Sequence, residues 1–212
     1  MFSDKLSSPI PITNHTTNGE ILDYLYSIFK ENIMDKAKRP KLFNKFIFIN
    51  FSKWIDLKSE VFWHLISLNR NERFNILPCN NDVTFMMCPN NCITPTETVL
   101  LSDGSERNVC YYRGTRIHWI NEIIELANKS DEDIKTWKKK NIIRGIPVQQ
   151  LYIRFTHGSV DYVIVFEEKY SQSGDVYQYY FVTAFPVFYI SKKLEFDQEY
   201  QSYQSQLLVP KK

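Results

Sequence analysis

Histidine, arginine and threonine are the residue types in this chain best suited to chemistry. His64 lies in FWHLISL, Arg113 and Arg116 lie in YYRGTRIHWI, and Thr183 lies in YYFVTAFPV. Cleavage of RNA without a metal needs a group that transfers protons near neutral pH and a cation that stabilises charge on the phosphate. Histidine suits the first task and the arginine fork suits the second. A hydroxyl near a strand end can add a neutral donor.

Other catalytic signatures are missing from the sequence. It has no P-loop, no G-x-G-x-x-G, no G-x-S-x-G and no H-E-x-x-H. It also lacks the cluster of carboxylates that a two-metal nuclease needs. These absences argue against the common nucleotide-binding, hydrolase and zinc-protease classes.

A second group of residues is suited to holding a nucleic acid. Its members are His118, Lys138, Lys139, Lys140 and Tyr180. Lysines attract phosphates, and exposed aromatic rings can stack on unpaired bases. For the lysine run the alternative is a solvated helix end whose cations complement the helix dipole.

Each catalytic candidate also has a purely structural explanation. His64 could be a histidine at the edge of the core, and Thr183 could be an ordinary strand threonine. The two arginines could pair with carboxylates of the predicted sheet, which are Asp161, Glu167 and Glu168. His157, in the turn RFTHGS, could simply face solvent.

All four cysteines lie in a loop-rich segment between residues 70 and 110. They are Cys79, Cys88, Cys92 and Cys110. Four thiolates could close a structural zinc site, although the paired C-x-x-C spacing of typical sites is missing. Buried free thiols are the other interpretation. The RNA chemistry itself requires no cofactor.

Hydrophobic periodicity predicts which elements position these residues. The predicted helices cover residues 21–29, 59–68, 117–127 and 131–140, with Ser59 and Ser130 as N-caps. A strand is expected over residues 45–55, and three further strands run between Val148 and Ile190. Both faces of the run DYVIVFEEKY are largely apolar, which indicates a central strand.

This order of elements predicts an α+β fold. N-terminal helices and an irregular cysteine-containing insert come first, followed by helices packed on an antiparallel meander of about four strands. We expect a flexible arm over residues 1–18, a helical part with the insert over 19–110, and an α+β core over 111–205.

The net charge and the lengths of the apolar runs indicate what the protein can bind and in which compartment it acts. The formal net charge of +2 gives no general attraction to nucleic acid, so a binding site needs a local cluster of cations. The N-terminus has no secretion signal and no run is long enough to span a bilayer, which predicts a cytoplasmic protein with reduced cysteines.

The C-terminal half resembles the barnase-EndoU-colicin-RelE group of nuclease domains, in the form found in phages and mobile elements. The segments that carry the resemblance are YYRGTRIHWINEII, DYVIVFEEK and YYFVTAFPVFYISKK, and it extends from near Tyr111 to near Tyr200. The resemblance implies a toxin-like or defence-related endoribonuclease that acts on tRNA or other RNA without a metal. The cysteine-containing insert is not part of the common pattern.

The resemblance also implies roles for individual residues. Thr183 matches the hydroxyl donor, and Arg113 and Arg116 match phosphate-binding positions. His64 matches the H-L-[IT] segment of an early helix and is the first choice for proton transfer, ahead of His118 and His157.

The sequence is therefore compatible with three functions. The first is an endoribonuclease that attacks through the ribose 2′-hydroxyl and leaves 2′,3′-cyclic phosphate ends, with an antitoxin or immunity protein as a partner. The second is a non-enzymatic nucleic-acid-binding module with a structural zinc. The third is a protein-interaction or immunity protein that uses an exposed aromatic surface. The sequence leaves the oligomeric state open.

Overall fold

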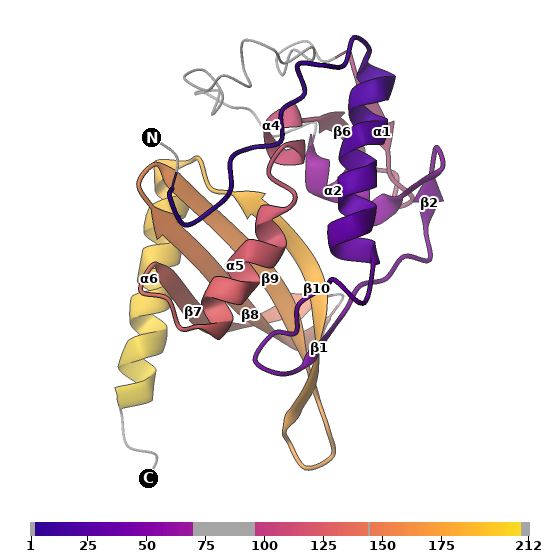
Figure 1. The fold of residues 1–212 in the computed structure, drawn as a ribbon. Coiled ribbons are helices and arrows are strands. Elements are labelled where there is room, and N and C mark those ends of the chain that lie inside the picture. Colours follow the sequence, from indigo (N-terminus) through magenta and orange to yellow (C-terminus); the bar gives the residue numbers. More distant parts are fainter. Residues whose placement is uncertain (1–2, 70–95, 144, 209–212) are drawn as a thin grey trace. The chain divides into compact units, whose positions relative to one another are not determined.

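The computed structural model describes residues 3–69, 96–143 and 145–208 (Figure 1). The chain forms two compact units, each assembled from separate stretches. The sheet unit combines residues up to Leu6 with Pro40–Ile49 and Glu122–Lys212, and the mixed unit contains Ser7–Arg39 and Asn50–Asn121. The units therefore do not follow the linear division at residues 18 and 110.

A five-stranded sheet forms the centre of the sheet unit, in the order β1-β10-β9-β8-β7. The strands are β1 Phe46–Phe48, β7 Ile134–Ile143, β8 Ile146–His157, β9 Val160–Tyr170 and β10 Val176–Pro186. Strands β7 to β10 form an antiparallel meander, and β1 pairs with β10 in parallel. The predicted α+β class and the four-stranded meander are confirmed.

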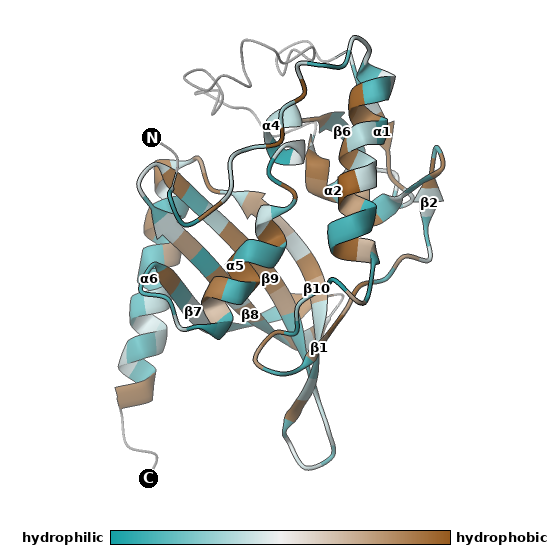
Figure 2. Cartoon of the chain, in the orientation of Figure 1, coloured by the Kyte–Doolittle hydropathy of each residue, from teal (hydrophilic) through white to brown (hydrophobic). Residues whose placement is uncertain are grey.

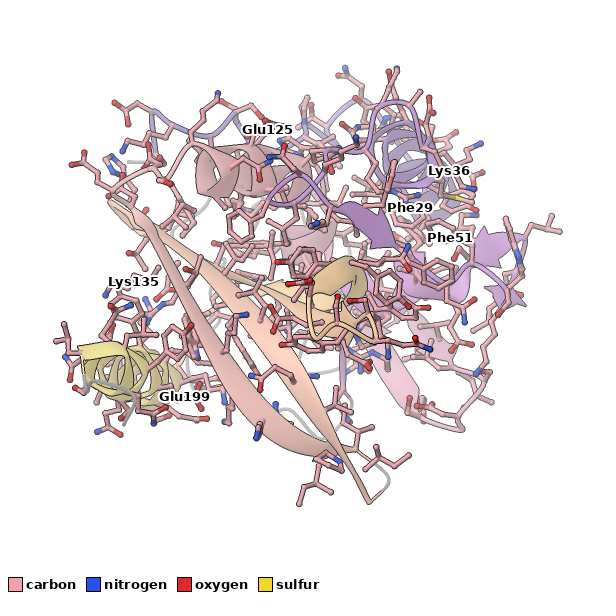
Figure 3. All side chains as sticks on the ribbon, turned by 90° about the horizontal axis from the view of Figure 1, so that it is seen from below. Phe29, Lys36, Phe51, Glu125, Lys135 and Glu199 are labelled. Carbon is pink, nitrogen blue, oxygen red and sulfur yellow. The ribbon has the colours of Figure 1, made fainter. Side chains whose placement is uncertain are left out.

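Helices lie on both faces of this sheet. Helix α5, Trp119–Asn128, carries Glu125, and helix α6, Ile190–Leu208, carries Glu199; Figure 3 shows these two residues on opposite sides of the sheet. Seven successive β9 residues from Val160 to Phe166 are buried, as expected for a strand covered on both faces.

Helix α6 was not predicted, because the last apolar run was assigned to a strand as far as Ile190. Strand β10 ends instead at Pro186, whose nitrogen cannot donate to a ladder. Within its described span, Phe196 is the buried residue of α6, and Figure 2 shows that most of the helix is hydrophilic. Tyr200 and Tyr203 pack against the same apolar cluster as Phe196, and a polar contact adds to it: Trp137 Nε1 donates to Glu199 at 3.0 Å.

The helix predicted over residues 131–140 is wrong. Strand β7 occupies this segment and pairs residue by residue with β8, from Ile134 opposite Phe155 to Ile143 opposite Ile146. Ser130 has a φ of 55°, in the left-handed region, whereas a helix N-cap needs an extended φ. The lysine run therefore lies on an edge strand, where its side chains alternate between the two faces.

The mixed unit begins with helix α1, Asn18–Phe29, which confirms the first predicted helix. Thr17 and Glu20 form a capping box at its start. The helix continues into a π-helical turn, η1 Lys30–Met34. Ring contacts then build an aromatic core: Phe29 lies 5.5 Å from Phe62 and 6.1 Å from Phe51 between ring centroids, and Figure 3 labels Phe29 and Phe51.

Short elements complete the mixed unit. They are β2 Trp54–Ile55, β3 Lys58–Ser59, α2 Glu60–Ile66, β4 Ser67–Asn69, β5 Thr98–Leu100, β6 Glu106–Val109 and α4 Tyr111–Gly114. Helix α2 confirms the predicted helix, and Ser59 is its N-cap with Val61 N–H as donor at 3.3 Å. The strand expected over residues 45–55 is split between β1 in one unit and β2 in the other.

Several side chains of the expected N-terminal arm are buried. Ser3 and Leu6 are buried, as are Ile10 and Ile12, and the Ile10 N–H donates to the Thr115 carbonyl at 2.8 Å. None of the described helices is both long enough and apolar enough to cross a membrane.

Candidate functional site

The end of α2 and two neighbouring elements bring His64 and two arginines together in the mixed unit. His64 lies in the last turn of α2, and the chain continues directly into β4. Strand β6 pairs with β4 and places Arg107 opposite Asn69. The Cys110 N–H donates to the Ile66 carbonyl at 2.7 Å and so fixes the start of α4, which carries Arg113.

The two guanidinium groups converge on Ser67. Arg107 donates from Nη2 to the Ser67 carbonyl oxygen at 3.0 Å and from Nε to the Ser67 hydroxyl at 2.8 Å. Arg113 donates from Nη1 to the same carbonyl oxygen at 2.9 Å. Two positive charges are therefore held close together beside the C-terminal end of α2, whose partial negative charge favours cations. Guanidinium groups are also well suited to bind phosphate oxygens.

This concentration of charge acts on His64. The pKa of the His64 imidazole is lowered to about 4, mainly by burial and in addition by the charges of Arg107 and Arg113. Asp103 and Glu60 oppose this shift more weakly. The ring is therefore neutral at physiological pH and able to accept a proton, and an anion bound beside it would raise its pKa. We call His64, Arg107 and Arg113 the His–Arg cluster.

Arg107 is a member of this cluster that the sequence analysis missed. The available signal was the Asp103-Gly104 pair between two short β-type runs, which is typical of a hairpin. That hairpin is β5–β6, joined by a turn in which Gly104 has a φ of 83°. Recognising it would have placed Arg107 on a strand next to the segment that follows α2.

Arg116 has a different environment from Arg113. Its side chain is fully buried, and Nη1 donates to the Tyr112 carbonyl at 2.9 Å and to the Thr115 hydroxyl at 3.1 Å. The guanidinium carbon lies 3.6 Å from the Tyr112 ring centroid. These contacts hold the turn between α4 and α5. His118 is half-buried beside Trp119, with 6.3 Å between ring centroids.

Thr183 belongs to the sheet unit, whereas the His–Arg cluster belongs to the mixed unit. It is half-buried on β10 opposite Val165, next to an irregularity in the pairing between Phe181 and Thr183. Tyr180 lies on the same strand and contacts Phe48 of β1, with 4.7 Å between ring centroids. The structure thus groups Thr183 with Tyr180 in one unit and His64 with Arg113 in the other.

Two of the three lysines in the run are in ion pairs. Lys138 lies 2.7 Å from Glu168, whose side chain is fully buried, and Lys139 pairs with Glu199 of α6. Lys140 is exposed. A groove of about 690 Å³ runs along this edge between β7 and α6, and its lining includes all three lysines.

The acidic residues considered as partners of the two arginines have lysine or arginine partners within the sheet unit. Asp161 pairs with Arg154 at 2.8 Å, and Glu167 pairs with Lys169.

Another candidate, His157, lies between two carboxylates. Its Nδ1 is 2.7 Å from Asp133 and its Nε2 is 3.1 Å from Asp4.

The predicted zinc site cannot be assembled from the residues that the structure describes. Cys79, Cys88 and Cys92 lie outside them. Cys110 is buried, and burial raises the pKa of its thiol. Over residues 3–69, 96–143 and 145–208, no group of three or more histidine, cysteine or acidic side chains is arranged to hold a metal. A structural zinc stays a prediction.

No family model, curated protein or solved structure matches this chain.

Proposed function

We propose that the protein is a toxin-like endoribonuclease that cleaves tRNA or mRNA without a metal. The observation that carries this proposal is the His–Arg cluster, in which a neutral histidine lies in the field of two guanidinium groups that share one carbonyl acceptor. This combination of a proton acceptor and two phosphate-binding cations matches the needs of 2′-hydroxyl attack. The resemblance in the C-terminal half points to the same chemistry.

In the proposed reaction, the two arginines bind the phosphate and stabilise the extra negative charge of the transition state. His64 accepts the proton of the 2′-hydroxyl as its oxygen attacks the adjacent phosphorus. The bond from phosphorus to the 5′-oxygen then breaks, the 5′-oxygen takes a proton from water, and the 2′,3′-cyclic phosphate forms while His64 returns its proton to the solvent. The charge of the bound phosphate opposes the fields of Arg107 and Arg113, so binding raises the pKa of His64 and makes it a stronger base.

The biological setting is part of the same proposal. An endoribonuclease of this type acts in the cytoplasm, in phage defence or in a toxin–antitoxin pair, and is held in check by an antitoxin or immunity protein. Thr183, which belongs to the sheet unit, is proposed as an additional hydroxyl donor, and Thr183→Ala should lower the rate of RNA cleavage.

The test is cleavage of RNA by purified protein in excess EDTA, followed by analysis of the product ends. Replacing His64 with alanine should lower the rate by about 10²-fold to 10⁴-fold, the usual contribution of a general acid or base. Replacing Arg113 with alanine should lower it by about 10²-fold. His15→Ala is the matched control, because His15 is another half-buried histidine of the mixed unit and packs on Tyr24.

The outcomes separate the three functions. Cleavage in EDTA with cyclic phosphate ends, lost in His64→Ala and kept in His15→Ala, supports the nuclease. Salt-sensitive binding to RNA that stays intact supports the non-enzymatic binding module. A stable complex with a protein and no binding to RNA at any salt concentration supports the interaction protein. Equal cleavage by wild type and His64→Ala would reject His64 as the proton-transfer residue.

A further inference from the structure

One face of the sheet carries a row of side chains that crosses every strand. In the strand register, Lys139 of β7 lies opposite Gln150 of β8, and Gln150 lies opposite Glu167 of β9. Glu167 in turn lies opposite Tyr180 of β10, which lies beside Phe48 of β1. Directly paired residues project from the same face of a sheet. Lys139 forms an ion pair with Glu199 of helix α6, so this is the face of the sheet that α6 covers near β7.

At the opposite end of the row, aromatic rings are exposed. Phe46 is 66% exposed and Phe48 is 41% exposed. The Phe48 ring lies 4.7 Å from the Tyr180 ring at an interplanar angle of 35°. Phe46 pairs with Gln178, two residues before Tyr180, so Phe46 shares the face of Phe48. Three rings on two adjacent strands therefore form a surface, which we call the aromatic face.

Lysine side chains accompany these rings. Lys41 Nζ lies 4.7 Å from the centroid of the Phe46 ring, and Lys169 Nζ lies 4.6 Å from the centroid of the Tyr180 ring. A lysine that rests over a ring can move to a phosphate when a base takes its place on the ring, and Lys169 would exchange its pair with Glu167 for the phosphate. Aromatic rings with neighbouring cations are the combination that binds the bases and phosphates of an unpaired strand.

We infer that the aromatic face binds single-stranded RNA, whose unpaired bases stack on Phe46, Phe48 and Tyr180 while Lys41 and Lys169 contact the phosphates. This inference rests on the proposed nuclease function and adds the class of its substrate. Bases in a duplex are stacked on one another and cannot reach the rings, so the expected substrate is a loop or an unpaired end.

Thr183 belongs to this same face. Thr183 pairs with Val165, and Tyr180 pairs with Glu167. Val165 and Glu167 are two residues apart on β9 and project from one face, so their partners do as well. The hydroxyl assigned to the reaction is thus placed on the strand and face that hold the stacked bases, which gives Thr183 a route to the RNA within the sheet unit.

The experiment measures fluorescence anisotropy of a labelled oligouridylate that carries 2′-O-methyl groups and therefore cannot be cleaved by 2′-hydroxyl attack. Phe48→Ala and Tyr180→Ala should each weaken binding about tenfold, the range found for loss of one stacking ring. Tyr177→Ala is the matched control, because Tyr177 is a 52% exposed tyrosine of the same strand and is not one of the three rings that define the aromatic face. A duplex of the same length should bind more weakly than the single strand.

Three results would overturn the inference: no binding of the single strand, equal binding of the duplex, or unchanged affinity in both Phe48→Ala and Tyr180→Ala. Circular dichroism verifies that each variant is folded, and Phe46→Ala, at the most exposed ring, replaces any variant that is not. Because the probe cannot be cleaved, binding with no cleavage of ordinary RNA would reject the nuclease and keep the aromatic face. Cleavage with unchanged affinity in the variants would do the reverse.

Discussion

Arg107 and Arg113 donate hydrogen bonds to the same atom, the carbonyl oxygen of Ser67, at 3.0 Å and 2.9 Å. Both guanidinium groups carry a positive charge, so an anion bound beside them would interact favourably with the two charges at once. The same pair of charges lowers the pKa of His64. The pKa of His64 should therefore rise when the two arginines bind an anion.

The first prediction concerns the titration of His64. NMR of the imidazole should give a pKa of about 4 in the free protein, and a higher pKa when inorganic phosphate is present. Arg113→Gln should also raise the pKa, because it removes one of the two charges that disfavour the imidazolium. A pKa that is unaffected by both phosphate and Arg113→Gln would show that burial alone sets it.

The second prediction concerns the stability of the fold as a function of pH. The folded pKa of His64, about 4, lies below its ordinary value of 6.5, so the unfolded chain binds the proton first as the pH falls. This contribution to stability is intact above about pH 6.5 and is lost progressively toward about pH 4. The free energy of unfolding in urea should fall by about 1–3 kcal/mol more in wild type than in His64→Gln over this range.

The control for this comparison comes from the carboxylates. Asp131 and Asp133 have pKa values below the ordinary range, because of the Asp133 backbone N–H and the Lys5 ammonium respectively, so their contributions are lost mainly at lower pH. Both proteins contain these groups, and the difference between them isolates His64. Parallel curves for wild type and His64→Gln would contradict the assigned pKa.

The third prediction separates structural from binding lysines in the run. Lys138→Ala should destabilise the protein by about 1–3 kcal/mol, because it removes the cation 2.7 Å from the buried Glu168 carboxylate, which keeps a hydrogen bond from the Tyr170 hydroxyl. Lys140→Ala should change stability by less than about 0.5 kcal/mol, because Lys140 is exposed on the same strand. Urea unfolding measures both. Equal stabilities would show that the Lys138–Glu168 pair contributes little.

The lysine run also shows which parts of the fold the sequence could and could not predict. Periodicity located α1, α2, α5 and the strands β8 to β10, because each is marked by the pattern of its own apolar residues. It failed at residues 131–140, where a polar, lysine-rich edge strand is specified by pairing with β8 and not by its own pattern. Arg107 escaped notice for a similar reason, since its neighbour Ser67 is 40 residues away in the sequence.

The fourth prediction concerns the Arg154–Asp161 pair, in which two parallel hydrogen bonds of 2.8 Å join side chains that are both buried. Asp161→Ala leaves the Arg154 guanidinium buried with a weaker partner, Asp197, and should cost about 3–5 kcal/mol. Lys192→Ala removes an exposed pair with Glu195 and should cost less than about 1 kcal/mol. A similar loss of stability in both variants would contradict the difference in burial.

The last prediction concerns how α6 is attached to the sheet. The Phe196 ring lies 5.5 Å from Trp137 and 6.1 Å from Tyr152 between centroids, and it is the apolar side chain that anchors the helix. Phe196→Ala should therefore cost about 3–5 kcal/mol and increase hydrogen exchange along α6 more than in β9. Leu194→Ala is the matched control, since Leu194 is 56% exposed on the same helix. An equal increase of exchange in both elements of Phe196→Ala would contradict this, because it would mean that α6 and the sheet still unfold together. The polar contacts of Glu199 and Asp197 would then be sufficient to hold the helix on the sheet.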